Sequence, residues 1–246
     1  MAEFTVQEIL TATSGELLTG PFEARVQGVS TDSRTLRRGE AFLALRGEKY
    51  DGHDFTGQAL AAGASALIVE KKMDFPPGVA VIRVASTLLA LGKLAAYHRQ
   101  RFSVQVIGVT GSNGKTTTKE MIGALLEEKY KVLKSAMNYN NEVGLPLTLL
   151  KMKPATEVVV LEMGMRGEGE IAYLAGLARP TGGVVTNVGV SHMELLGSRE
   201  AIARAKGELI ASLNREGLAV LNADDPYVRA MQGLFPGRSV FYGFEE

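Results

Sequence analysis

Val-Gln-Val-Ile-Gly-Val-Thr-Gly-Ser-Asn-Gly-Lys-Thr-Thr-Thr, residues 104–118, is the stretch that decides the fold. Its first six residues are mostly apolar and predict a short buried strand, and residues 111–114 predict a glycine-rich turn. The helix expected after Lys115 carries four apolar residues on one side, namely Met121, Ile122, Leu125 and Leu126. This order of strand, loop and helix is what a phosphate-binding loop requires, because close backbone N–H groups and a helix N-terminus both favour an anion.

The loop departs from the strict nucleotide-binding pattern, which has four residues between its two glycines. Here five residues separate Gly108 from Gly114, whereas Gly114-Lys115-Thr116 fits fully. Lys115 can reach the β- and γ-phosphates of a nucleotide, and the Thr116 hydroxyl can bind Mg²⁺. A surface turn that contains Gly-Lys-Thr is the simpler alternative, but the flanking strand and helix favour the phosphate loop.

The composition limits the possible classes of function. The chain has 246 residues, of which 46% are hydrophobic and 22% are charged, and its formal net charge is zero. This charge balance gives no indication of nucleic acid or of an acidic membrane as a partner. The absence of cysteine excludes disulfides and thiolate metal sites. The acidic N-terminus is unlike a signal peptide, and no apolar run is long enough to cross a bilayer, so we expect a cytoplasmic protein without membrane insertion.

The order of elements predicts two α/β domains, residues 1–101 and residues 102–246. In the first, strands are expected at 26–29, 40–45, 66–69 and 79–84, with helices from the N-cap Asp54 to Gly63 and over 86–101. In the second, the strands expected after the opening one lie at 131–133, 157–161, 183–186, 218–221 and 239–242. Because helices alternate with these strands, we expect an open, mostly parallel sheet.

Three groups that could bind a ligand or take part in a reaction follow strands of the second domain, namely the Lys115 loop, Glu162 and His192. In an open parallel sheet, ligands bind beyond the carboxyl ends of the strands. Glu162 follows a buried β-branched run, where an unpaired carboxylate is costly. It could cap a helix or form an ion pair, but next to a phosphate loop a Mg²⁺ ligand is the better interpretation.

Lys206 strengthens the case for His192, which alone would be an ordinary polar loop residue. On the helix expected from Ser198, Lys206 lies four residues after Ile202 and three before Leu209. Its position is therefore in the middle of the apolar face. A lysine there either extends its ammonium to the surface beside a ligand cleft or has a specific function.

The sequence resembles the Mur ligases of peptidoglycan synthesis over nearly its whole length. The similar segments of the ATP-binding part are 108–121, 138–150, 161–165, 186–192, 205–208 and 221–225. Those of the first domain are 30–34, 41–47 and 51–55. The resemblance implies an N-terminal UDP-binding α/β domain followed by a central, P-loop-like ATPase domain with a mostly parallel sheet.

The resemblance also implies ATP and two Mg²⁺ ions as cofactors. The implied nucleotide-binding residues are Thr110, Gly111, Ser112, Asn113, Gly114, Lys115, Thr116 and Thr117. The implied catalytic residues are Lys115, Glu162, His192 and Lys206, and the implied metal ligands are Thr116, Glu162, His192 and Lys206. In the family the lysine is carbamylated, and a carbamate forms only from a neutral amine. An apolar face lowers the pKa of a lysine and so favours this modification.

The implied substrates are UDP-MurNAc-tripeptide and D-alanyl-D-alanine, joined through an acyl phosphate at the expense of ATP. Ser30, Asp32, Ser33 and Arg34 are the candidates for binding the UDP part, although by themselves they read as a capped turn. Asn138, Asn140 and Asn141 form a loop that is expected to face the substrate.

The chain departs from the family in length, because Mur ligases have three domains. We expect that it ends inside the ATP domain, lacks the C-terminal domain, and has little or no ligase activity by itself. The full-length enzyme is expected to be a monomer. Two alternatives stay open: another amide ligase of the superfamily, either the diamino-acid-adding type or the folylpolyglutamate type, and a non-catalytic nucleotide-binding module.

Overall fold

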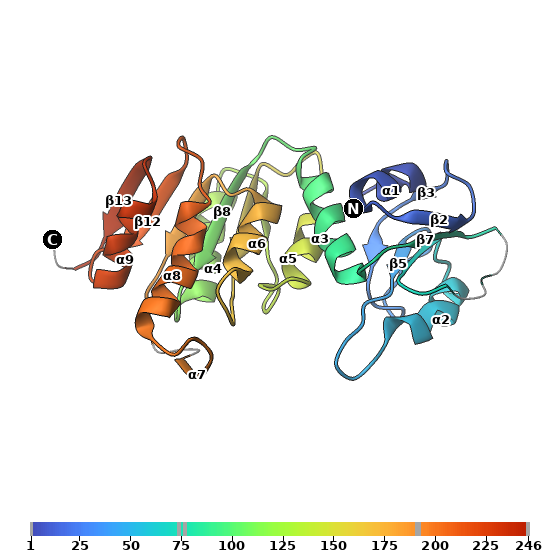
Figure 1. Ribbon diagram of the computed structural model, residues 1–246. Coiled ribbons are helices and arrows are strands. Elements are labelled where there is room, and N and C mark those ends of the chain that lie inside the picture. The colour runs from blue at the N-terminus through green and yellow to red at the C-terminus, as the bar shows by residue number, and fades with distance from the viewer. Residues whose placement is uncertain (1, 73–74, 76–77, 190–192, 245–246) are drawn as a thin grey trace. The chain divides into compact units, whose positions relative to one another are not determined.

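The protein consists of two compact units. The structure is a computed structural model that describes residues 2–72, 75, 78–189 and 193–244. The first unit contains residues 1–101 and 149–153, and the second contains 102–148 and 154–246. The sequence did not predict that the short segment 149–153 returns to the first unit. Each unit has its own sheets (Figure 1).

The first unit is built on a five-stranded sheet of order β2-β7-β6-β5-β4. Its strands are β2 (Glu16–Thr19), β4 (Val29–Ser30), β5 (Ala41–Leu43), β6 (Ala66–Val69) and β7 (Ala80–Arg83). Neighbouring strands are parallel except β2, which is antiparallel to β7. A separate two-stranded antiparallel sheet pairs β1 (Phe4–Thr5) with β3 (Arg25–Val26). The core beneath the main sheet includes Phe42, Leu67 and Val81, which are almost completely buried.

Local side-chain caps mark where most helices of the first unit begin. They are α1 (Val6–Thr13), the 3₁₀ helix η1 (Gly52–Phe55), α2 (Thr56–Ala61) and α3 (Thr87–Arg99). Thr5 and Glu8 form a reciprocal capping box at α1, and the Ser86 hydroxyl caps α3. The prediction of Asp54 as the N-cap was wrong. The chain first makes a 3₁₀ turn, and the Asp51 carboxylate caps it by accepting from the backbone N–H of His53.

The second unit contains a six-stranded sheet of order β13-β12-β11-β8-β10-β9, in which all neighbours are parallel. The strands are β8 (Gln105–Thr110), β9 (Val132–Lys134), β10 (Val158–Glu162), β11 (Gly182–Val185), β12 (Leu218–Asn222) and β13 (Arg238–Tyr242). The predicted α/β class with a parallel sheet is confirmed. Every residue of β10 is buried, as expected for a β-branched strand covered on both faces.

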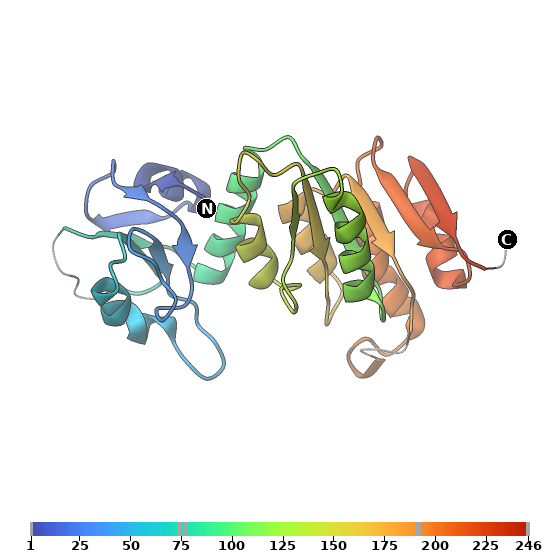
Figure 2. The same cartoon turned by 180° about the vertical axis from the view of Figure 1, so that it is seen from behind.

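Helices cover both faces of this sheet. They are α4 (Lys115–Glu127), α5 (Gly144–Leu149), α6 (Glu170–Ala178), α7 (Met193–Leu196), α8 (Arg199–Ala211), α9 (Pro226–Ala230) and the 3₁₀ helix η2 (Met231–Leu234). Helices α6 and α8 lie on one face, and α4 lies on the other (Figures 1 and 2). Because parallel strands end at one edge, the loops after β8, β10 and β11 meet there.

Helix α4 uses a narrower apolar stripe than the sequence predicted. Ile122 and Leu126 pack against the core cluster that contains Val109 and Val160. Met121 is 62% exposed and Leu125 is 74% exposed, so placing them on the same inner side was wrong. A helix that contacts a sheet on one side buries residues four apart, and the adjacent row turns toward solvent.

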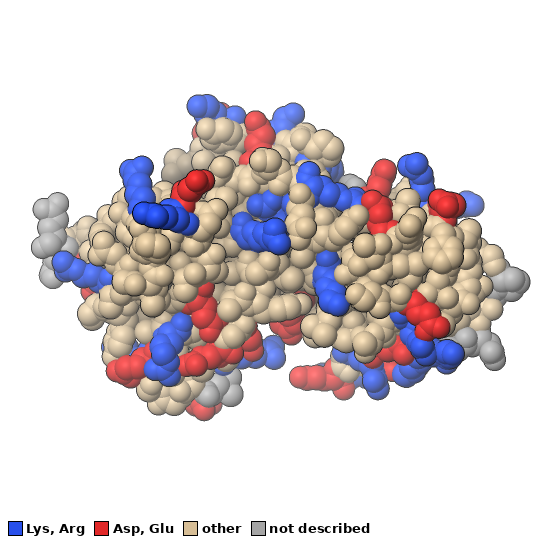
Figure 3. Space-filling view, turned by 45° about the horizontal axis from the view of Figure 1, so that its top comes forward, with Lys and Arg blue, Asp and Glu red and all other residues tan. Residues whose placement is uncertain are grey.

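The surface agrees with the balanced composition. Basic and acidic side chains both occur on the face shown in Figure 3. Within the described part of the chain, the helices are all too short or too polar to cross a membrane.

The two adjacent leucines of α4 provide a test of this packing. Leu126→Ala should lower the free energy of unfolding by about 2 kcal/mol, because it leaves a cavity against the sheet. Leu125→Ala, the matched control, should change it by less than about 0.5 kcal/mol, as is usual at exposed positions. Urea unfolding followed by circular dichroism measures both. Equal losses for the two variants would contradict the orientation of α4.

Candidate functional site

The loop between β8 and α4 approaches β11 so closely that it needs glycine. Gly111 has φ +153°, and a Cβ added there would lie 1.8 Å from the Thr186 hydroxyl oxygen. Gly114 has φ +80° and is the N-cap of α4. Since a side chain is strained or excluded at both positions, these glycines are required by the path of the loop.

Hydrogen bonds to the segment after β11 fix this loop in position. Asn187 Oδ1 accepts from the Asn113 N–H at 2.9 Å, and the Thr186 hydroxyl donates to the Asn113 carbonyl at 2.6 Å. The Gly189 N–H donates to the Ser112 hydroxyl at 2.8 Å. The N–H groups of residues 115–117 precede the helical hydrogen-bond ladder, which begins with the N–H of Thr118 bonded to the Gly114 carbonyl. The loop is therefore a fixed frame with a helix N-terminus at its opening.

Two predicted nucleotide-binding residues have other roles in this frame. Thr110 is completely buried, and its hydroxyl donates to the Met163 carbonyl at 2.9 Å, which joins β8 to the end of β10. The Lys115 ammonium donates to the carbonyl oxygens of Gly111 at 2.9 Å and Ser112 at 3.3 Å. To reach a bound phosphate, Lys115 must exchange these carbonyl contacts for the anion.

Glu162, the last residue of β10, is the centre of a polar cluster beside the loop. It is 4% exposed, and its Oε2 accepts from the Thr116 hydroxyl at 2.7 Å. Its Oε1 accepts from the Asn140 amide at 2.8 Å. The structure thus brings together a carboxylate and a hydroxyl, which are hard oxygen ligands that suit Mg²⁺, and an amide N–H that holds the carboxylate.

The amide-rich loop before α5 contributes one side chain to this cluster. Asn140 contacts Glu162, but Asn141 Oδ1 instead accepts from the N–H groups of Gly144 at 2.9 Å and Val143 at 3.3 Å, at the start of α5. Asn138 is exposed and has a left-handed backbone, with φ +67°. Of the three predicted asparagines, only Asn140 lies in the cluster.

Lys206 is buried on the apolar face of α8, as the periodicity predicted. It is 2% exposed and lies between Ile202 and Leu209 in the helical stripe, which are both fully buried. Burial, together with the nearby positive charge of Lys115, lowers the pKa of the ammonium from 10.5 to about 8. A substantial neutral fraction at mildly alkaline pH makes this amine able to react with carbon dioxide.

A metal ion in this region would need ligands of other kinds than a cluster of carboxylates. Among the described residues, no three His, Cys, Asp or Glu side chains gather into a metal site. Thr116, Glu162 and a phosphate oxygen would suit one Mg²⁺ ion, and a carbamate on Lys206 would supply further oxygen ligands. His192, the other predicted ligand, lies outside the described residues.

In the first unit, the predicted UDP-binding cluster lies on the wall of a cavity of about 620 Å³. The Arg34 guanidinium forms a two-pronged bond to Asp32, with distances of 2.9 and 2.7 Å, and lowers the pKa of this carboxyl to about 2. Ser33 lines the cavity and donates to Gln58 at 2.7 Å. Ser30 instead shapes the turn through its hydrogen bonds with the Asp32 backbone. The segment is therefore a capped turn that also forms part of the cavity wall.

Sequence reasoning missed the aromatic side of this cavity. Phe42, Tyr50 and Phe55 line it, and the rings of Tyr50 and Phe55 meet edge to face with centroids 6.4 Å apart. The only available signal was the position of these two aromatic residues next to the segment 51–54. A cavity with aromatic faces and a guanidinium suits a ligand that combines a flat ring with phosphate.

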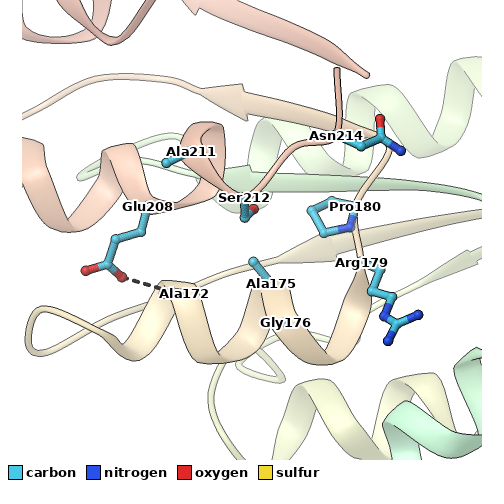
Figure 4. Close-up of a pocket in the computed structure, with 9 residues that line it drawn as sticks. All are labelled: Ala172, Ala175, Gly176, Arg179, Pro180, Glu208, Ala211, Ser212 and Asn214. Atoms are coloured by element: carbon cyan, nitrogen blue, oxygen red, sulfur yellow. Dashed lines mark hydrogen bonds between the residues drawn. The ribbon is translucent and has the colours of Figure 1, made fainter. Parts of the chain in front are cut away.

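A second cavity, of about 550 Å³, lies between α6 and α8 (Figure 4). Its lining is mostly small residues, and Glu208 stands at one end with its carboxylate bonded to the Ala172 N–H at 2.9 Å. The same carboxylate accepts from the Gly169 N–H at 2.6 Å. Glu208 thus caps the N-terminus of α6 and ties it to α8, the helix that carries Lys206.

Comparison with known proteins places both units in one family. The Mur ligase middle domain matches residues 109–246, and the Mur ligase family catalytic domain matches residues 25–99. A UDP-N-acetylmuramoyl-tripeptide–D-alanyl-D-alanine ligase of Bacillus subtilis is 47% identical over 99% of this chain and 53% of its own length. The chain therefore spans about half the length of the curated relatives it matches.

Solved structures support the same family. MurF from Acinetobacter baumannii superposes with a TM-score of 0.93 and 34% identity, over 99% of this chain and 54% of that one. MurF from Thermotoga maritima in complex with ADP has a TM-score of 0.83 and 39% identity, over 90% of this chain and 51% of that one.

The lowered pKa of Lys206 predicts a stability difference that depends on pH. Below about pH 8 the folded protein carries the full cost of the buried charge, and this cost falls as the folded-state amine deprotonates toward pH 10.5. Lys206→Met should therefore be more stable than the original chain at pH 7, by up to about 3 kcal/mol, and this advantage should shrink as pH rises.

Urea unfolding in carbon-dioxide-free buffer from pH 7 to 10.5 measures this difference. Lys129→Met, at an exposed position of the same unit, is the matched control and should show a difference that does not vary with pH. An advantage of Lys206→Met that is constant or grows with pH would contradict a buried, destabilised ammonium.

Proposed function

Because the chain belongs to the Mur ligase family, we propose that it supplies the substrate-binding and ATP-binding parts of a UDP-N-acetylmuramoyl-tripeptide–D-alanyl-D-alanine ligase. The gathering of Thr116, Glu162 and Asn140 beside the phosphate loop supports this proposal most strongly. The names of the similar proteins support the choice of substrates, and the ADP complex of the Thermotoga maritima relative supports the use of ATP. The predicted cytoplasmic location and the monomeric full-length enzyme stay predictions.

In the proposed nucleotide complex, the N–H groups of residues 115–117 and the helix N-terminus bind the phosphates. Lys115 leaves the carbonyl oxygens of Gly111 and Ser112 and extends to the β- and γ-phosphates. Thr116 and Glu162 would hold one Mg²⁺, and His192 with a carbamylated Lys206 would hold the second. Bound Mg²⁺ would neutralise charge on the transferring phosphoryl group.

The proposed reaction makes one amide bond and consumes one ATP. The terminal carboxylate of the tripeptide attacks the γ-phosphorus of ATP, ADP leaves, and an acyl phosphate forms. The amine of D-alanyl-D-alanine then attacks the acyl carbon, loses a proton, and expels inorganic phosphate. In both steps the Lys115 ammonium stabilises negative charge on the phosphoryl oxygens, which is the main electrostatic task of phosphoryl transfer.

The cavity of the first unit is the proposed site for the UDP part of the precursor. The Arg34 guanidinium can bind the diphosphate, and the aromatic wall of Tyr50 and Phe55 can contact the flat base. Asn138 and Asn141 keep their proposed place in the substrate-facing loop, where Asn141 shapes the start of α5.

Two single variants test the proposal because the two ligands bind to different units. Lys115→Ala should weaken binding of ADP with Mg²⁺ by about 10-fold or more, since it removes a charged phosphate contact, and should leave UDP-MurNAc-tripeptide binding unchanged. Arg34→Ala should weaken the binding of UDP-MurNAc-tripeptide and leave the binding of ADP with Mg²⁺ unchanged. Isothermal titration calorimetry of residues 1–246 with each ligand measures both.

Arg38→Ala, an exposed change that does not line the cavity, is the matched control for Arg34 and should affect neither ligand. The proposal fails if the original chain binds neither ligand. It also fails if Lys115→Ala and Arg34→Ala weaken both ligands equally.

A further inference from the structure

Lys119 is a buried charge that the proposed reaction does not use. It lies one turn after Lys115 on α4, and its side chain is 0% exposed. Taking an ammonium out of water is costly unless hydrogen bonds and an opposite charge compensate. The Lys119 ammonium donates to the Ser135 carbonyl at 2.7 Å and lies 3.0 Å from Glu120 Oε1.

Ser135 connects this ammonium to the strand that carries Glu162. The residue is 1% exposed and comes directly after β9. Its backbone N–H donates to the Val160 carbonyl at 3.1 Å, and its hydroxyl accepts from the Glu162 N–H at 3.0 Å. Lys119 therefore holds, through one carbonyl, the residue that binds the backbone of Glu162.

Ser135 also begins the loop that provides Asn140. This loop returns to β10, where the Asn140 carbonyl accepts from the Gly164 N–H at 2.8 Å and its amide contacts Glu162 Oε1. Thr116, three residues before Lys119 on α4, contacts the other oxygen of the same carboxylate. Because residues three apart lie on one face of a helix, α4 reaches this cluster at two points, one through Thr116 and one through Lys119.

We infer that Lys119 is a positioning residue for the proposed Mg²⁺ site, acting through Ser135 to set the place of Glu162 and Asn140. The inference rests on the proposed function, which gives Glu162 its role as a metal ligand. An apolar side chain could fill this buried position without the cost of desolvation. The ammonium instead supplies a directed bond that fixes the loop relative to α4.

A matched control lies next to Ser135. Lys134 forms ion pairs with Glu120 at 3.1 Å and with Glu127 at 3.1 Å, on the outer side of α4. Lys134→Met therefore removes a positive charge from the same Glu120 partner without touching the bond to the Ser135 carbonyl. Lys119→Met keeps an unbranched buried side chain that is one atom shorter, and it removes the ammonium together with its contacts to the Ser135 carbonyl and to Glu120.

The test measures how much Mg²⁺ strengthens ADP binding to residues 1–246. Calorimetric titrations with ADP are made at saturating Mg²⁺ and in EDTA, and the ratio of the two affinities is compared. Lys119→Met should reduce this ratio about 10-fold while ADP affinity in EDTA changes less than about twofold. Lys134→Met should leave both affinities unchanged. Ser135→Ala should also reduce the ratio. Because both changes act on the same connection, the fold reduction in the double variant should be smaller than the product of the two single reductions.

An unchanged ratio in Lys119→Met would overturn the inference. An equal loss of both affinities, accompanied by a lower melting temperature, would also overturn it, because it would show a merely structural role. If Lys119→Met does not fold, Ser135→Ala decides, and an unchanged ratio there overturns the inference. If the original chain shows no effect of Mg²⁺ on ADP binding, the metal site of the proposed function fails first, and the inference falls with it.

Discussion

The Glu162 carboxylate, at the end of the buried strand β10, is the group on which the site depends. It is almost fully buried, and such a charge is costly unless its oxygens are bonded. Thr116 from α4 and Asn140 from the loop before α5 provide these bonds, and Ser135 holds its backbone. A single side chain thus joins the phosphate-loop helix, strand β10 and the asparagine loop at the carboxyl end of the sheet.

The second constraint is the close contact between the phosphate loop and the segment after β11. Gly111 passes so near Thr186 that a side chain would not fit, and Asn187 then holds the backbone of Asn113. This frame fixes the start of α4 without a ligand. Lys115 and the buried Lys206 influence each other electrostatically in this unit, so a bound anion would relieve the repulsion between two cations.

Much of this arrangement could be predicted from local patterns. The β-branched run of β10 indicated a strand buried on both faces, and the helical spacing of Ile202 and Leu209 placed Lys206 in the core. Roles that depend on contacts distant in sequence were missed. The sequence could not show that Thr110 is buried against Met163 or that Leu125 turns to solvent, because each depends on which neighbour the fold supplies.

A crystal structure of the chain grown with ADP, Mg²⁺ and bicarbonate is the most direct measurement. The account predicts phosphates on the N–H groups of residues 115–117, with the Lys115 ammonium moved from the carbonyl oxygens of Gly111 and Ser112 to the β-phosphate. It also predicts Mg²⁺ bound by Thr116 and Glu162, and density for a carbamate beyond Lys206 Nζ. ADP bound elsewhere, or bound in the loop with the Thr116 hydroxyl still donating to Glu162 and no Mg²⁺ between them, would contradict it.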